Sequence, residues 1–319
     1  MKLIADSGST KTDWSLVDES GKVVATCKSQ GLNPYHLSED EMLRVLQEKV
    51  RKPLLVQLSA SSFCGCTGVG TMDDLSVYFY GSGVTDAMIT KMETLLRQAF
   101  DASEAHAASD MLGAARALLG QESGIAVILG TGSNSCLYDG EKIVKGVPPL
   151  GYILGDEGSG TAIGKAFFRL IFRNSQALSL REKFVEWSGM DYAAVIDRIY
   201  RQPLANTYLA SVSTFVGGKL VELKENSQED SVEFLLLSDM VKEVYRDFCE
   251  HILSYYAASS ASTSSVSALS SSNKTVGFVG SIAYYFQDYI ASALQENGFA
   301  MGKVLRSPME GLLKYHLMR

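Results

Sequence analysis

The fold is decided by residues 3–13, which read LIADSGSTKTD. The apolar run at the start predicts a short buried strand. The acidic residue Asp6 and a turn of Gly, Ser and Thr follow at once, and an alternating run at 14–17 then resumes the sheet. A hairpin tip rich in N–H and hydroxyl donors can wrap a phosphate, and a carboxylate at its mouth can hold hydrated Mg²⁺. Taken alone, the stretch fits an ordinary polar hairpin equally well.

The composition indicates a globular protein with a full core. The chain has 319 residues, which is enough for two domains, and it is 46% hydrophobic and 20% charged. A net charge of −7 without any basic run argues against a nucleic-acid partner. No apolar segment reaches the roughly 18 residues of a membrane span. A strand at the very start predicts no signal peptide, and an odd number of cysteines predicts reduced thiols and a cytoplasmic protein.

The first part of the chain predicts an antiparallel meander followed by alternating strands and helices. The expected strands are 2–7, 12–18, 21–29, 75–80 and 104–109, and the expected helices are 38–50, 86–100 and 111–119.

The same pattern then recurs. The apolar strand 125–129 runs into the small polar turn 130–135, and strands follow at 136–138 and 142–145. A glycine-rich loop at 150–160, several helices between 160 and 257, a strand at 275–279, a helix at 282–295, a strand at 303–306 and a last helix after Pro308 complete the chain. The uncharged, serine-dominated stretch 258–272 predicts a flexible surface insertion.

Two such turns in one chain resemble the actin, Hsp70 and sugar-kinase superfamily. The resemblance rests on 6–12 as a first phosphate motif, 129–134 as a second, and 279–281 as an adenosine turn. Together with the run GDEGS at 155–159, it is similar to the N-acetylglucosamine kinases of the BadF/BadG/BcrA/BcrD ATPase family. This implies a two-lobed, actin-like α/β ATPase fold (ribonuclease H-like) with the active site in the cleft between the lobes. We expect lobes at 1–109 and 110–319, and the helix at 308–319 could pack back on the first lobe.

The resemblance implies ATP and Mg²⁺ as cofactors. Small residues let backbone N–H groups approach phosphate oxygens closely. The expected nucleotide-binding residues are Gly8, Ser9, Thr10, Lys11, Gly130, Thr131, Gly132, Gly280 and Ser281, with Asp6 holding Mg²⁺ through water. An exposed hairpin lysine explains Lys11 equally well.

The resemblance places the catalytic base at Asp110. An aspartate there can accept the proton of a sugar hydroxyl and orient its oxygen for attack on phosphorus. The alternative is a helix N-cap, for which Asp is well suited, and one residue can fill both roles.

The resemblance also implies a set of sugar-binding residues. Asn33 matches an asparagine that recognises an N-acetyl group, and Asp156 matches an aspartate that binds sugar hydroxyls; a turn residue and a helix cap are the respective alternatives. The run 148–150 departs from a tryptophan-containing stretch of the animal relatives, which leaves the identity of the sugar open. The full expected set is Asn33, Ser133, Asn134, Gly151, Tyr152 and Asp156.

We therefore expect an ATP-dependent kinase that phosphorylates an N-acetylated amino sugar, N-acetylglucosamine to its 6-phosphate before glucosamine or N-acetylmuramate. The expected partner is this small molecule, with no nucleic acid, no membrane and a homodimer as a family expectation. The alternatives are an ATPase activator of a dehydratase or reductase system, and a nucleotide-gated binding protein. Cys64 and Cys66 supply only two ligands, so we expect them to be structural, and the four histidines suggest no triad.

Overall fold

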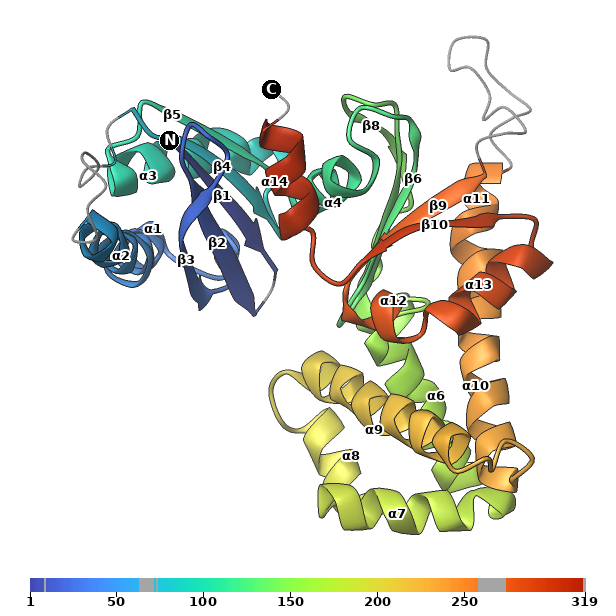
Figure 1. Cartoon of the computed structure of the whole chain (residues 1–319). Coiled ribbons are helices and arrows are strands. Elements are labelled where there is room, and N and C mark those ends of the chain that lie inside the picture. The colour runs from blue at the N-terminus through green and yellow to red at the C-terminus, as the bar shows by residue number, and fades with distance from the viewer. Residues whose placement is uncertain (9, 63–71, 73, 258–273, 318–319) are drawn as a thin grey trace. The chain divides into compact units, whose positions relative to one another are not determined.

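The computed structural model describes residues 1–8, 10–62, 72, 74–257 and 274–317. The chain divides into two compact units, of which the first comprises Met1–Gln121 with Pro308–Arg319 and the second comprises Glu122–Ser307. Each unit is built on one five-stranded sheet with helices packed against it (Figure 1). The α/β class expected from the sequence is confirmed.

The first sheet has the strand order β3-β2-β1-β4-β5. Its strands are β1 (Lys2–Ser7), β2 (Lys11–Val17), β3 (Val23–Gln30), β4 (Ser76–Gly81) and β5 (Glu104–Ser109). The first three strands form the predicted antiparallel meander, and β4 and β5 run parallel to β1. Parallel neighbours need a crossover, which helix α3 (Asp86–Phe100) supplies between β4 and β5.

The two faces of the first sheet bury different groups. Leu3 and Phe79 lie in the core beneath α1 (Glu39–Val45), α2 (Lys52–Ser62) and α3. Because successive side chains alternate across a strand, Tyr78 and Tyr80 point to the opposite face. There they contact α4 (Asp110–Leu119) and α14 (Met309–Leu317).

The helix predicted to end near residue 50 continues to Ser62. The five-residue-spaced turn η1 (Leu46–Arg51) joins α1 to α2, and within it the N–H of Lys52 donates to the carbonyl of Gln47. This wider turn lies immediately before Pro53, whose ring and missing N–H would disrupt an ordinary α-helical turn. The sequence-based boundary was therefore wrong, because the chain accommodates the proline by widening one turn.

The second sheet repeats the plan of the first. Its order is β10-β9-β6-β7-β8, formed by β6 (Gly124–Leu129), β7 (Ser133–Tyr138), β8 (Ile143–Gly146), β9 (Thr275–Val279) and β10 (Ala300–Leu305). A meander of three strands is again extended by two strands parallel to the first. The strand pattern that recurs in the sequence is thus repeated in all five strands of each sheet.

Helices occupy most of the second unit between β8 and β9 (Figure 1). They are α5 (Gly151–Leu154), α6 (Gly160–Arg173), η2 (Ser175–Ala177), α7 (Leu178–Ser188), α8 (Tyr192–Tyr200), α9 (Ala205–Glu225), α10 (Val232–Phe248), η3 (Cys249–Leu253) and α11 (Ser254–Ala257). Helices α6 and α9 pack so closely that a Cβ on Gly164 would lie 2.1 Å from the Leu209 carbonyl oxygen. The predicted helix 282–295 is interrupted at Phe286, giving α12 (Ser281–Tyr285) and α13 (Gln287–Glu296).

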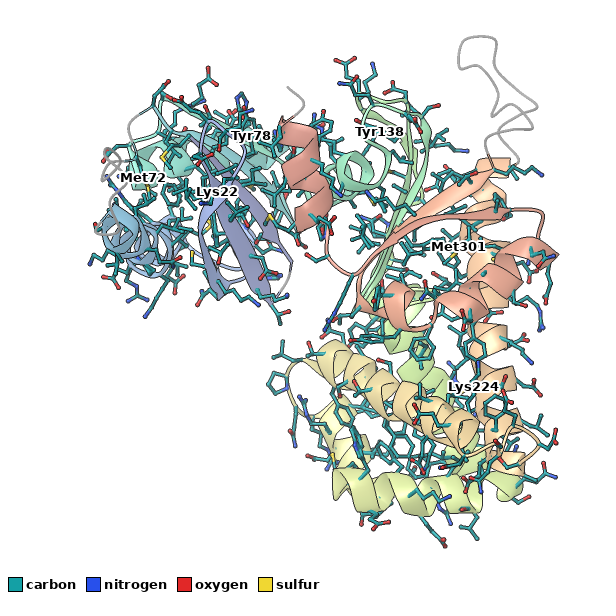
Figure 2. All side chains as sticks on the ribbon, viewed as in Figure 1. Lys22, Met72, Tyr78, Tyr138, Lys224 and Met301 are labelled. Atoms are coloured by element: carbon teal, nitrogen blue, oxygen red, sulfur yellow. The ribbon has the colours of Figure 1, made fainter. Side chains whose placement is uncertain are left out.

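The last helix belongs to the first unit. A Cβ on Gly311 of α14 would lie 2.3 Å from the Ala117 carbonyl oxygen of α4, and the Tyr80 hydroxyl lies 2.8 Å from Nε2 of His316. The ring of Tyr78, labelled in Figure 2, packs 4.0 Å from the His316 ring between centroids. The compact units divide after Gln121, whereas we expected a boundary at 109/110, because α4 packs on β4 and β5.

Among the described residues, no helix is both long enough and apolar enough to cross a membrane. Ser9, Cys64, Cys66 and the serine-rich stretch 258–272 lie outside the described residues.

Candidate active site

In the first unit, the candidate residues gather at the carboxyl ends of the parallel strands. Ser7, Gly81 and Ser109 are aligned in register across β1, β4 and β5. Asp6 directly precedes this row, and Asp110 directly follows it as the first residue of α4. Ligands of open α/β sheets bind at this edge, so the topology alone brings the two predicted carboxylates to one place.

Asp6 and Asp110 interact electrostatically, each carrying a like charge that repels the other. Burial, followed by the negative charges of Asp110 and Asp13, raises the pKa of Asp6 to about 7, against a smaller opposing effect of Lys11. No hydrogen bond or ion pair to the Asp6 carboxylate is formed by the described residues. An ionised carboxylate without such partners is a hard oxygen ligand of the kind that Mg²⁺ prefers. Mg²⁺ is commonly bound by one or two carboxylates together with several waters.

Asp110 does not cap its helix. The N-cap is Ser109, whose hydroxyl accepts a 3.2 Å hydrogen bond from the N–H of Leu112. Asp110 is the next residue, and its Oδ1 accepts a 2.8 Å hydrogen bond from the N–H of Met111. The cap alternative for Asp110 is therefore wrong. Burial raises the pKa of Asp110, and the backbone hydrogen bond opposes that rise only in part.

At the β1–β2 hairpin, one of the expected phosphate donors is already used by a hydrogen bond within the turn. The N–H of Gly8 donates to the carbonyl of Lys11 at 2.9 Å, so this N–H closes the turn and does not point outward. Thr10 is exposed, and the exposed Lys11 ammonium pairs with Asp13 at 2.9 Å. The hydroxyls of Ser7 and Thr12 bond to each other at 2.8 Å beneath the tip.

Asn33 lies in the loop after β3. Its Oδ1 accepts a 2.9 Å hydrogen bond from the N–H of Tyr35, as in a turn residue, and the side chain lies against Gly83. A Cβ on Gly83 would come within 2.4 Å of this Oδ1, and the positive φ of +82° also favours glycine there. The amide group Nδ2 makes no hydrogen bond to the described residues, so the turn role and a role in recognition are compatible.

The second unit presents a matching turn between β6 and β7. The N–H of Gly130 donates to the Gly132 carbonyl at 3.0 Å, and the carbonyls of Gly130 and Thr131 accept from the first turn of α6 at 2.9 and 3.2 Å. The N–H groups of Thr131 and Gly132 form no hydrogen bond within the described part of the chain. They are therefore available to an anion, whereas the N–H of Gly130 is not.

Asp156 is fastened to this turn. Its Oδ1 accepts a 3.1 Å hydrogen bond from the N–H of Ser133, and a Cβ on Gly132 would lie 2.9 Å from both carboxylate oxygens. Asp156 has a left-handed backbone with φ of 61° and precedes the N-cap of α6, which is Ser159. Burial raises the pKa of Asp156, while the Ser133 hydrogen bond and the charge of Lys165 act in the opposite direction.

Lys165 is a residue that sequence reasoning missed. From α6 its ammonium donates to the carbonyls of Tyr152 at 2.6 Å and Gly155 at 3.3 Å, which fastens the loop before Asp156. Burial lowers the pKa of Lys165, and the negative charge of Asp156 partly offsets this.

The predicted adenosine turn lies at the same edge of the second sheet. The N–H of Gly280 donates to the Leu305 carbonyl at 2.9 Å, and a Cβ on Gly280 would lie 2.1 Å from the Leu129 carbonyl oxygen. With a φ of +125°, this position admits only glycine. Ser281 begins α12 and is exposed.

A pocket of about 330 Å³ lies within the second unit. Three predicted sugar residues line it, whereas Gly151 and Tyr152 do not. Residues 148–150, the run that differs from the tryptophan-containing stretch of the animal relatives, form part of the lining. Further lining residues come from the end of α10 and from the turn η3, which the sequence did not indicate. Its lining residues are Ser133, Asn134, Ser135, Val147, Pro148, Pro149, Leu150, Leu154, Asp156, Glu157, Phe248, His251 and Ile252.

No family model matches the sequence. The solved structure of a protein described as "putative N-acetylglucosamine kinase" from Porphyromonas gingivalis is 34% identical, with a TM-score of 0.83, and covers 100% of this chain and 99% of its own. This chain belongs to the N-acetylglucosamine kinase-like family of actin-type ATPases.

More distant structures share the fold of this family member. A protein of the same description from Chromobacterium violaceum is 16% identical, with a TM-score of 0.67 and 98% coverage of both chains. A ROK family glucokinase from Streptomyces griseus, solved with glucose and AMPPNP, is 13% identical, with a TM-score of 0.52 and coverage of 98% and 97%.

No group of three or more Cys, His, Asp or Glu side chains that could hold a metal is found in the part of this family member that the structure describes. Cys27, Cys136 and Cys249 are free thiols, and burial raises the pKa of each.

Proposed function

We propose that this protein is an ATP-dependent kinase that transfers the γ-phosphoryl group of ATP to a hydroxyl of an N-acetylated amino sugar, N-acetylglucosamine to its 6-phosphate. The observation that carries the proposal is the pair Asp6 and Asp110, two partly buried carboxylates at the carboxyl ends of parallel strands whose pKa values are both raised, chiefly by desolvation. Family membership supports it, since the P. gingivalis relative is described as such a kinase.

Each carboxylate has its own role in this proposal. Asp110 accepts the proton of the attacking sugar hydroxyl, and its raised pKa lies closer to the range in which a general base works well at neutral pH. Asp6 would hold Mg²⁺ through water, and the chemistry that the ion would supply is neutralisation of charge on the phosphate oxygens. The two aspartates suit Mg²⁺ because their oxygen atoms are hard ligands and because a cation would relieve the repulsion between the two carboxylates.

The second unit supplies donors and orientation. The unpaired N–H groups of Thr131 and Gly132 bind phosphate oxygens, and their fixed position adds stabilisation without reorganisation. Asp156 accepts from sugar hydroxyls while Ser133 holds its carboxylate in place. Gly280 lets the adenosine approach the end of β9, because no side chain projects there.

The charge of the pocket bears on which sugar is bound. Two carboxylates, Asp156 and Glu157, line it, and the lining residues that the structure describes include neither Lys nor Arg. An anionic sugar such as N-acetylmuramate would meet repulsion there, whereas a neutral sugar would not. The free Nδ2 of Asn33 is suited to donate to an acetamido carbonyl, which favours N-acetylglucosamine over glucosamine.

A coupled assay of ADP release against a panel of sugars tests this proposal. The panel contains N-acetylglucosamine, glucosamine, glucose, N-acetylmannosamine and N-acetylmuramate, each with Mg-ATP and with ATP plus EDTA. We expect ADP release that requires both metal and sugar, with the highest kcat/KM for N-acetylglucosamine. ADP release that is the same with and without every sugar would contradict the proposal and indicate a nucleotide-gated protein.

A further inference from the structure

A chain of hydrogen bonds beneath the hairpin tip joins three strands and a loop. The N–H of Leu32 donates to Oγ of Ser7 at 3.1 Å, the hydroxyls of Ser7 and Thr12 lie 2.8 Å apart, and Thr12 donates to the Gln30 carbonyl at 2.9 Å. Ser7 ends β1, Thr12 begins β2, Gln30 ends β3, and Leu32 lies in the loop that follows. The four groups therefore add side-chain links between these segments to the hydrogen bonds of the sheet ladder.

The direction of each bond is fixed by proton counting. A hydroxyl has one proton, and that of Thr12 goes to the Gln30 carbonyl, which accepts only. Thr12 must then accept from Ser7, and Ser7 in turn accepts from Leu32. Ser7 is 1% exposed and Thr12 is 0% exposed, so neither hydroxyl can reach a ligand directly.

The members of this chain are sequence neighbours of the proposed catalytic groups. Ser7 lies between Asp6 and Gly8, and Leu32 directly precedes Asn33. A second link runs the same way: the carbonyl of Ser7 accepts from the N–H of Ser82 at 2.8 Å, and the next residue, Gly83, lies against the Asn33 side chain. Two separate hydrogen bonds to Ser7 therefore fix the position of the Asn33 loop relative to the β1–β2 hairpin.

We propose that Ser7 is a positioning residue that aligns the sugar-reading Asn33 with the metal-binding and phosphate-binding end of β1. This inference rests on the proposed function. Ser7 touches neither substrate; it acts through Leu32 on the loop and through Thr12 on the hairpin. A displacement of about 1 Å in a reacting group can lower a rate by about 100-fold, so a link of this kind matters for transfer as well as for folding.

The test compares variants that keep or remove each hydroxyl. Ser7→Ala removes the acceptor of the Leu32 N–H, Thr12→Val removes the second hydroxyl at similar shape, and Thr12→Ser keeps it. We expect Ser7→Ala and Thr12→Val to raise the sugar KM about 10-fold or more, while the ATP KM changes less than about threefold. Thr12→Ser should keep the sugar KM of wild type. Hydrogen exchange at 31–35 should accelerate in Ser7→Ala and remain slow in Thr12→Ser.

A merely structural role predicts a different pattern. Ser213→Ala is the matched control, because the buried Ser213 hydroxyl donates to the Ala210 carbonyl within α9 and touches neither turn. If Ser7→Ala behaved like this control, with lower thermal stability and both KM values unchanged, the proposal would be overturned. If wild type phosphorylated no sugar, the proposed function would fail instead, and unchanged exchange at 31–35 in Ser7→Ala would separately overturn the link.

Discussion

The N–H of Ser133 donates a 3.1 Å hydrogen bond to Oδ1 of Asp156. This bond joins the turn proposed to bind phosphate to the residue proposed to bind sugar, and both residues line the same pocket. Gly132 of this turn has no Cβ, and a Cβ built there would lie 2.9 Å from both carboxylate oxygens of Asp156. The relationship can therefore be disturbed by adding a single carbon atom.

Gly132→Ala is expected to displace Asp156, because the new Cβ would lie 2.9 Å from both carboxylate oxygens. We expect the sugar KM to rise about 10-fold, in keeping with the loss of one charge-assisted contact, with little change in the melting temperature. Gly130→Ala is the matched variant, since a Cβ there meets no atom within 4 Å. Equal sugar KM values for the two variants would contradict the role of Asp156.

Asp110→Asn is expected to lower kcat by at least about 100-fold and to leave ATP affinity nearly intact, because the amide cannot accept the hydroxyl proton. Rapid-quench kinetics and nucleotide titration measure the two quantities separately. Ser109→Ala distinguishes capping from catalysis: it removes the helix cap and should cost about 1 kcal/mol of stability with a far smaller effect on kcat. A collapse of ATP affinity in Asp110→Asn would show that this residue is misassigned.

The raised pKa of Asp6 predicts a dependence of stability on pH. An unfolded aspartate has a pKa of about 3.9, whereas folding raises that of Asp6 to about 7. The folded state binds this proton more tightly, so the contribution of Asp6 to stability is present below pH 4 and is lost as pH rises through 7.

Asp6→Asn should remove that loss. At pH 8 we expect the free energy of unfolding of the variant to exceed that of wild type by about 1–3 kcal/mol, a range that allows for solvent screening. This difference should vanish near pH 4. Mg²⁺ should stabilise wild type at pH 8 and not the variant. Equal response of both proteins to Mg²⁺ would argue that the ion binds elsewhere.

Asn33→Asp tests recognition of the acetamido group without disturbing the turn. The aspartate keeps the oxygen that accepts from the Tyr35 N–H but lacks the NH₂ donor. We expect the KM for N-acetylglucosamine to rise about 10-fold and that for glucosamine, an ammonium sugar, to rise less or fall. If both KM values changed in parallel, Asn33 would have only its structural role.

Much of the architecture could be predicted from the sequence. The apolar runs at 3–5, 125–129 and 275–279 fall on β1, β6 and β9, because strands covered on both faces need continuous apolar residues. The two meanders revealed the duplication, and parallel strand ends then had to bring Asp6 and Asp110 to one edge.

The features that the sequence did not predict depend on three-dimensional geometry and not on any local sequence pattern. The turn η1 lets a helix pass Pro53, where the local rule predicts an end. Ser109 and Asp110 are both good caps, and only the backbone angles decide between them. His251 and Phe248 line the pocket beside Ser135 of β7 although they are distant from it in the sequence, and no local pattern pairs segments that lie so far apart.

The most direct test of the central claim follows the γ-phosphoryl group itself. Wild type is mixed with γ-³²P-labelled ATP, Mg²⁺ and N-acetylglucosamine in a single turnover, and the products are separated. We predict that the label appears in the 6-phosphate of the sugar and that Asp110→Asn slows its appearance by at least about 100-fold. Label that appears only as inorganic phosphate, at a rate independent of the sugar, would contradict the account.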